Sequence, residues 1–159
     1  MTPPQIAILK AAILADPALA SQPLTNTGSV AVAAALNQNA VPAYTVWKTS
    51  LSTREIGDTM SSAEVGGLTT ANTNRLMVMQ AYSDGFFNPS RADTRAGFDG
   101  VFSGAGGVLT RAALLILYKR LANRFEKLFA TGTGTDAIPA MLGLEGAVTS
   151  DDVQLARES

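Results

Sequence analysis

The stretch 108–130, VLTRAALLILYKRLANRFEKLFA, is the longest uninterrupted helical pattern in the chain and dominates the expected fold. Apolar side chains recur in it at spacings of three and four residues, which places them on one face of an α-helix. They are Leu114, Leu117, Leu121, Phe125 and Leu128, with Ile116 and Phe129 widening the face. A helix so apolar on one side must bury that side against its own chain or a neighbour. We predict one helix over 108–130 with the other helices packed around it.

The predicted helix also carries a basic flank, made of Arg111, Lys119, Arg120, Arg124 and Lys127. Three interpretations are open: a solvated face with Glu126 as counter-charge, a charged contact between subunits, or a contact with a nucleic-acid backbone. The third lacks the interleaved aromatic residues that single-strand binders use. The members taken as candidate interface residues are Arg111, Arg120, Arg124 and Lys127.

Two helices and one extended segment are expected in the first fifty residues. Prolines at the first turn favour a helix that starts near Pro3 and stops before Pro17. The alanine-rich segment 30–37 favours a second, short helix. The β-forming side chains that follow predict an extended element near 43–48.

Trp47, the only tryptophan, lies in that extended element. It is either a core residue whose indole N–H is hydrogen-bonded or an anchor at a protein interface, where tryptophan is enriched. Together with its neighbour Lys48, it is a candidate interface residue.

The middle of the chain predicts three further helices. Ser52 and Glu55 fit a capping box, which starts a helix of about two turns. A glycine-containing loop should follow over 61–68, and then a longer helix over 69–87. A helix over 90–102 is expected to pair with the long helix in antiparallel fashion, across a hinge or sharp turn at 103–107.

The C-terminal segment 131–159 is expected to be mostly irregular. Glycines at 131–135 end the long helix. A last short helix is capped by Thr149 or Ser150, with Asp151 and Asp152 in its first turn, where negative charge is favourable. This helix has few apolar residues to bury, so we predict an extended segment that becomes ordered on a partner. Both aspartates are candidate interface residues.

Length and composition limit the classes of protein to which the chain can belong. The chain has 159 residues, 47% of them hydrophobic, which suits a single helical domain spanning 1–159. Only 16% are charged, as expected if partner subunits cover the surface or if the exposed residues are uncharged and polar. A net charge of −1 does not favour nucleic-acid binding by the whole chain. No membrane-spanning run and no signal peptide are expected.

Enzyme chemistry has little support in the sequence. Histidine and cysteine are absent, which excludes imidazole bases, thiolate nucleophiles and metal sites built on either residue. The glycine clusters lack the Lys-Ser or Lys-Thr of a phosphate loop. The acidic pairs are explained by helix capping. No catalytic residue, cofactor or metal site is therefore predicted, and the fold class is mainly α: a helical bundle with a short extended element and an irregular C-terminal segment.

Several segments resemble a family of small tailed-bacteriophage virion proteins. The first two are VWKTSLSTREI at 46–56 and LTTANTNRL at 68–76. The later ones are RAGF at 95–98, RAAL at 111–114, KRLANRFEKLFATGTG at 119–134, and the short segments Leu144-Glu-Gly and Asp152-Val near the end. The similarity covers about 40–155, and its hallmark is Val-Trp-Lys/Arg-Thr followed much later by a helix that ends in Glu-Lys-Leu.

The resemblance implies a head-to-tail adaptor in the neck of the virion, assembled in the host cytoplasm. Such adaptors form a homo-oligomeric ring, a dodecamer, that binds the portal protein and receives a tail or nozzle protein, while packaged DNA passes through the channel without sequence-specific binding. A tail, head-completion or capsid-decorating protein is the alternative within the class. A small DNA-binding or regulatory helical module is the alternative of another class, and an enzyme has the least support.

Overall fold

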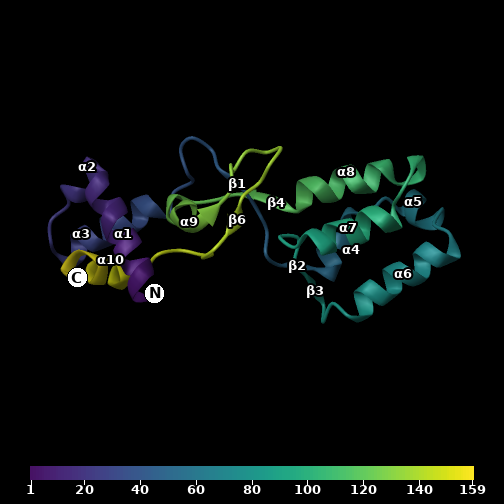
Figure 1. The fold of residues 1–159 in the computed structure, drawn as a ribbon, viewed down its shortest axis with the longest axis horizontal. Coiled ribbons are helices and arrows are strands. Elements are labelled where there is room, and N and C mark those ends of the chain that lie inside the picture. The colour runs from purple at the N-terminus through teal and green to yellow at the C-terminus, as the bar shows by residue number, and fades with distance from the viewer. The chain divides into compact units, whose positions relative to one another are not determined.

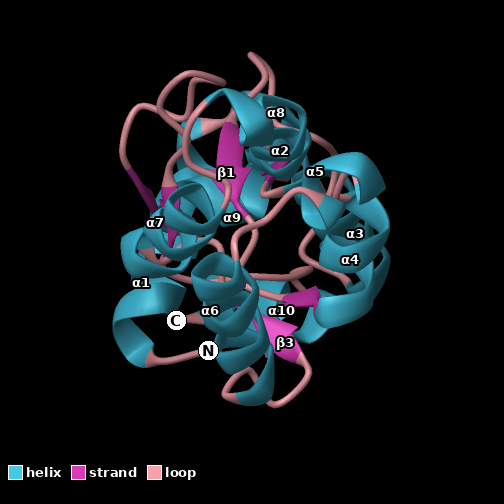
Figure 2. Cartoon of the chain, turned by 90° about the vertical axis from the view of Figure 1, so that its right-hand side faces the viewer, coloured by secondary structure: helices cyan, strands magenta, loops and turns pink.

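The computed structural model describes all residues, 1–159, and is mainly helical, as predicted. Helices make up most of the chain, and the strands are short pieces that form three two-stranded sheets (Figure 2). The chain divides into two compact units, which we call unit 1 (Met1–Val46 and Leu121–Ser159) and unit 2 (Trp47–Arg120).

This division differs from the single domain that we predict from length. The chain leaves unit 1 through β1 (Thr45–Trp47) and returns through β4 (Lys119–Leu121), and these two strands form one of the sheets (Figure 1). Each unit contains an apolar cluster of its own. Length and hydrophobic content indicate only how much apolar surface the whole chain can bury, so they do not distinguish one core from two.

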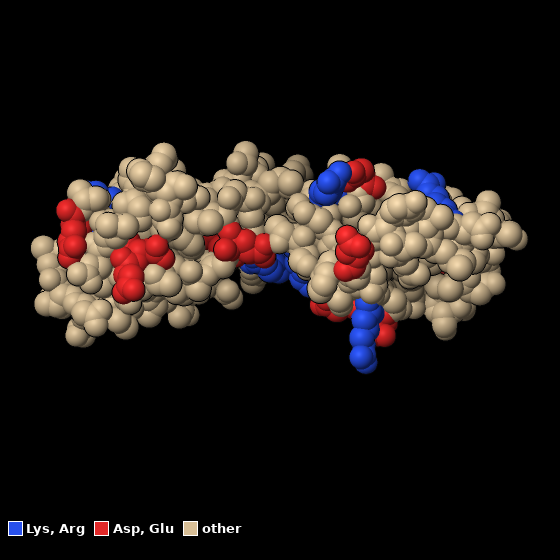
Figure 3. Space-filling model, turned by 90° about the horizontal axis from the view of Figure 1, so that it is seen from below, with Lys and Arg blue, Asp and Glu red and all other residues tan.

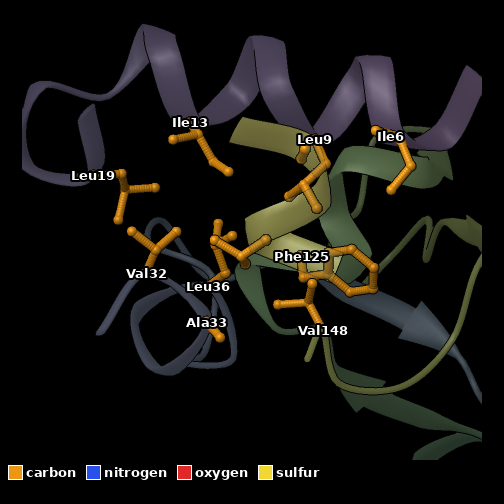
Figure 4. Close-up of a cluster of buried hydrophobic side chains, with 11 residues drawn as sticks. Ile6, Leu9, Ile13, Leu19, Val32, Ala33, Leu36, Phe125 and Val148 are labelled. Carbon is orange, nitrogen blue, oxygen red and sulfur yellow. The ribbon is translucent and has the colours of Figure 1, made fainter. Parts of the chain in front are cut away.

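Unit 1 is built on five helices from both ends of the chain. They are α1 (Pro3–Ala15), α2 (Pro17–Ala20), α3 (Asn26–Leu36), α9 (Arg124–Phe129) and α10 (Ser150–Glu158). Ile6, Leu9 and Ile13 of α1 point into the core toward Val32 of α3 and Phe125 of α9 (Figure 4). The predicted first helix is thus confirmed, because its apolar face and its flanking prolines are local signals.

A small antiparallel sheet completes unit 1. Its strands are β5 (Ala130–Thr131) and β6 (Met141–Leu142), and Ala130 lies opposite Leu142. A second apolar cluster, Val46, Ala122 and Ala140, is fully buried beside it. The segment 131–149 has little regular structure otherwise, in agreement with the irregular character predicted for it.

The last helix, α10, is ordered and packed, contrary to the extended segment that we predict for 131–159. It packs against α3 and α1, with Val153 and Ala156 fully buried. Thr149 caps it by accepting a hydrogen bond from the Asp152 amide at 3.1 Å. Its two buried side chains are small, but they pack into the apolar cluster formed by the N-terminal helices. These helices are far from α10 in the sequence, so the sequence pattern around α10 does not indicate them.

Unit 2 contains the remaining elements. Its helices are α4 (Thr53–Thr59), α5 (Ser62–Gly66), α6 (Thr70–Ala81), α7 (Ala92–Val101) and α8 (Val108–Leu117), with a 3-10 turn at Ala105–Gly107. The strands β2 (Leu51–Ser52) and β3 (Phe86–Phe87) pair in antiparallel fashion. Its core cluster centres on aromatic rings, with the Phe98 ring 5.0 Å from Phe87 and 6.3 Å from Tyr118 between centroids.

The capping box predicted at the start of α4 is confirmed, whereas two element bounds in unit 2 are wrong. Ser52 and Glu55 form the predicted capping box, with the Ser52 amide donating to the Glu55 carboxylate at 2.8 Å. The predicted loop 61–68 contains α5, which starts at the N-cap Ser61. The predicted helix 69–87 ends at Ala81, because the chain turns and then pairs as β3 with β2.

The predicted helix 108–130 is broken into α8, β4 and α9, which is the largest correction. The Ala122 amide donates to the Tyr44 carbonyl at 2.8 Å, and the Ala122 carbonyl accepts from the Ala40 amide at 3.0 Å. Backbone groups engaged in this way cannot continue an i to i−4 helical ladder. Asn123 then caps α9, accepting from the Glu126 amide at 2.7 Å. The apolar spacing is therefore that of two short helices that belong to different units.

The expected pairing of 90–102 with the long helix is also revised. The helices α7 and α8 are bent by 118° relative to each other, and α7 packs chiefly against α6, while α8 packs against α4. No single helix is long and apolar enough to cross a membrane; α7 and α8 meet that test only as this bent pair.

Candidate assembly surface

Helix α8 is held in unit 2 at its first turn. The Glu64 carboxylate accepts from the amides of Leu109 at 3.0 Å and Thr110 at 2.7 Å, two of the donors that a helix N-terminus leaves unpaired. Arg111 donates to the carbonyls of Phe102 and Gly104, which close the preceding turn. The glycine-rich segment before α8 is thus a tight turn, one of the two interpretations that the sequence left open.

Ionised Glu64 is part of this anchor. Desolvation raises the pKa of the carboxyl, but hydrogen bonds from Thr110 and Leu109 outweigh it and hold the pKa below the usual 4.5. A depressed pKa in the folded state means that the interaction stabilises unit 2 above the unfolded pKa and is lost as the pH falls through the folded one.

Glu64→Gln is therefore expected to lower the melting temperature of unit 2 at pH 7 and to come closer to the wild type at pH 3, because protonation of the carboxyl removes the interaction. Thermal melts followed by Trp47 fluorescence at both pH values measure the difference. Asp58→Asn is the matched control, since Asp58 is exposed and makes only an i to i+4 ion pair with Arg54. An equal gap at both pH values would contradict the role of the charge.

The side of α8 that faces away from the core of unit 2 is apolar and exposed. Four large side chains lie there, with exposed fractions that reach 67% for Leu109 and 73% for Ile116. With Ala112 they form the α8 face, which consists of Val108, Leu109, Ala112, Leu115 and Ile116. Their spacing of one, four, seven and eight residues is that of one helical stripe. Leu114 on the other side is buried in the core, so α8 carries large apolar side chains on two sides, and the exposed stripe is of the kind that marks protein–protein contacts.

A groove of about 550 Å³ runs beside the α8 face. Its apolar wall is formed by Val108, Ala112 and Leu115 of α8. The groove is also lined by Arg111 of α8 and by Trp47, Arg95, Asp99 and Tyr118. The Arg95 guanidinium lies 4.1 Å from the centroid of the Trp47 ring and also donates to the carbonyls of Pro89 and Ser90. Arg95 is therefore held in place by a cation–π contact and by hydrogen bonds.

Tyr118 is the unusual member of the groove. Its side chain is only 3% exposed, and its hydroxyl has no hydrogen-bond partner. Burial raises the pKa of Tyr118, with a smaller contribution from the Asp99 charge, so the hydroxyl stays protonated and able to donate. Buried hydroxyls without a partner are rare in folded proteins.

The predicted basic flank is divided between the two units. Arg111 lies on α8 in unit 2, while Arg124 and Lys127 lie on α9 in unit 1. Arg124 makes an ion pair with Asp16 at 2.5 Å, and that hydrogen bond lowers the pKa of Asp16. Lys127 lies 5.2 Å from the centroid of the Tyr44 ring. The flank is therefore not one surface, because the helix that would align these residues is interrupted.

The other predicted interface residues have separate positions. Trp47 is half-buried against the core of unit 2, next to the groove, so it has features of both interpretations. The Lys48 amide donates to the Tyr118 carbonyl at 2.8 Å. Arg120 lies in β4. Asp152 accepts from the Thr149 hydroxyl at 2.7 Å, whereas Asp151 is exposed at the start of α10.

Sequence reasoning missed the α8 face and most of the groove. The face has a helical spacing of its own, and a test for a second apolar stripe would have found it. The capping pattern from Asn123 to Glu126 likewise marks a helix start inside the stretch predicted as one helix. Tyr118, Arg95 and Asp99 carry no such signal, because only the tertiary fold brings them together.

Comparison with known protein families, with curated proteins and with solved structures gives no match. No group of three or more His, Cys, Asp or Glu side chains is placed to hold a metal ion.

Proposed function

We propose that this protein is a structural subunit of a bacteriophage virion, a head-to-tail adaptor that assembles into a ring below the portal and receives the tail. The observation that supports assembly best is the α8 face. Contiguous exposed apolar stripes are typical of protein–protein contacts. The resemblance to small virion proteins supplies the virion context.

The character of the surface supports the same proposal. On the face drawn in Figure 3, most surface atoms belong to uncharged residues, and charged side chains lie in small, separated groups. Protein interfaces are depleted in charge at their centre, because a charge that loses water must find a partner. A lightly charged surface and, on α8, an exposed apolar stripe favour contact with other protein subunits, namely further copies, the portal and a tail protein.

The double variant Leu109→Glu/Ile116→Glu is expected to weaken assembly by more than about 100-fold. Two apolar side chains that become buried in the contact between subunits contribute about 3–6 kcal/mol to the binding free energy. Both positions are exposed on a helix, so the fold should remain, as far-UV circular dichroism will show. Native mass spectrometry of the protein, alone and with purified portal, measures the assembly.

The matched control is Leu14→Glu/Leu24→Glu, which changes two exposed leucines of unit 1. A wild-type protein that stays monomeric with and without portal would overturn the proposal. Assembly without portal binding would favour the tail or capsid-decorating alternative. The DNA-binding alternative depends on a basic flank that the fold divides, and tight, salt-dependent binding to duplex DNA would be needed to restore it.

A further inference from the structure

The turn between α6 and β3 contains one of the two Asp-Gly pairs in the chain. The pairs are Asp84-Gly85 and Asp99-Gly100, and the sequence has no Asn-Gly pair. An aspartyl carboxyl can react with the next backbone amide, and it does so most readily before glycine, because glycine has no side chain to obstruct the approach. The two pairs are equal in sequence, so the structure decides which of them reacts.

The reacting groups of the Asp84-Gly85 pair are exposed and have no partner. Both residues lie on the surface. Neither the Asp84 carboxylate nor the Gly85 amide makes a hydrogen bond. Asp84 has φ of 48°, the only residue other than glycine with a positive φ, and Gly85 follows with φ of 84°. A surface turn of this kind allows the backbone rotation that brings the amide nitrogen to the carboxyl carbon.

The Asp99-Gly100 pair lies inside α7, which spans Ala92–Val101. The Asp99 side chain is also exposed, so access to water does not distinguish the two pairs. The Gly100 amide, however, belongs to the helical ladder, in which each N–H pairs with the carbonyl four residues earlier. Its nitrogen reaches the Asp99 carboxyl only after the helix opens locally, which costs free energy.

We infer that Asp84 is a site of spontaneous isomerisation to isoaspartate. The Gly85 nitrogen bonds to the side-chain carboxyl carbon of Asp84 and gives up its proton, and the carboxyl loses its hydroxyl, so one water leaves. The product is a succinimide ring. Water then adds to one of the two ring carbonyls, and the bond from that carbon to nitrogen breaks. Attack at the side-chain carbonyl restores aspartate, and attack at the backbone carbonyl gives isoaspartate. No oxidant or other reactant is consumed.

The isomerised turn disturbs the pairing of β2 with β3. Isoaspartate adds Cβ to the main chain, so the turn becomes one atom longer. The Gly85 carbonyl accepts from the Thr53 amide at 2.9 Å, and the next residue, Phe86, lies opposite Ser52. These contacts fix the start of α4, which Ser52 caps. Isomerised protein is therefore expected to melt at a lower temperature than fresh protein.

Peptide mapping after incubation of the full chain at mildly acidic pH tests the inference, because trypsin places the two pairs in separate peptides, 76–91 and 96–111. Chromatography separates the isoaspartyl form of each peptide, and electron-transfer fragmentation identifies it. In the folded protein, isoaspartate is expected to accumulate at least about ten-fold faster in 76–91 than in 96–111, the factor that about 1.4 kcal/mol of helix opening supplies. In urea the two peptides should convert at similar rates.

Asp84→Glu is the matched variant, because it keeps the carboxylate but would have to close a larger ring that forms more slowly. Its peptide 76–91 should stay unmodified, and its melting temperature should not change during incubation. Equal conversion of the two peptides in the folded protein would overturn the inference. So would an unchanged peptide 76–91 under conditions in which the urea-unfolded chain reacts. If isomerised wild-type protein melts like fresh protein, the stated effect on the strand pair is wrong.

Discussion

Replacing Phe98 by alanine is expected to lower the free energy of unfolding of unit 2 by about 3–5 kcal/mol, the range for a large core aromatic residue. The Phe98 side chain is 1% exposed and lies between the rings of Phe87 and Tyr118. Alanine loses both aromatic contacts and leaves a cavity that two packed rings cannot fill without moving. The loss is a large part of the stability of a unit this small.

Urea unfolding followed by Trp47 fluorescence measures this effect, because the only tryptophan packs against the core of unit 2. Phe86→Ala is the matched control: Phe86 is exposed, so its truncation should cost less than about 1 kcal/mol in the monomer. Equal losses for the two variants would contradict the position of Phe98 in the core.

Replacing Val153 by aspartate is expected to destabilise unit 1 by about 3–5 kcal/mol, as an uncompensated buried charge does. Val153 is fully buried on α10, in the cluster that α1 and α3 provide. The members of that cluster are all hydrophobic, so a carboxylate placed among them would lose its hydration. The expected result is loss of the helical signal of α1, α3 and α10 together.

Far-UV circular dichroism in urea measures the loss, with Leu155→Asp as control, because Leu155 lies two residues further along α10 and is exposed. Aspartate has the same intrinsic helix propensity at both positions, so the comparison isolates burial. If the two variants unfold at the same urea concentration, then α10 does not pack on the core, and the C-terminal segment is the frayed tail that the sequence suggests.

Signals within a few residues of one another predicted most of the individual helices. Prolines and apolar spacing bound α1, and the Ser52–Glu55 pair starts α4. Thr149 starts α10, as one of two predicted caps. The β-forming residues near Trp47 predicted β1. In each case the side chain and the backbone group that it satisfies lie within one turn, so no distant partner is needed to define the element.

The candidate site was much less predictable. Trp47 and Arg111 were selected from the sequence, and both line the groove. Arg124 and Lys127 were selected on the assumption of one continuous helix, and they lie in the other unit. Tyr118 was treated as part of that helix and not as a site residue. Its unpaired hydroxyl depends on what every surrounding element offers it, and one sequence does not report this.

The stretch 108–130 shows which features follow from local sequence and which depend on the tertiary structure. Its residues alone determine that two runs are helical and apolar, because periodicity and the Asn123 cap are properties of neighbouring residues. The break between the runs was decided by the tertiary structure. Backbone groups of Ala122 pair with Ala40 and Tyr44, about 80 residues away in the chain, and these bonds replace helical ones. Backbone donors and acceptors are the same in every residue except proline, so the sequence carries no mark of which distant segment they will pair with.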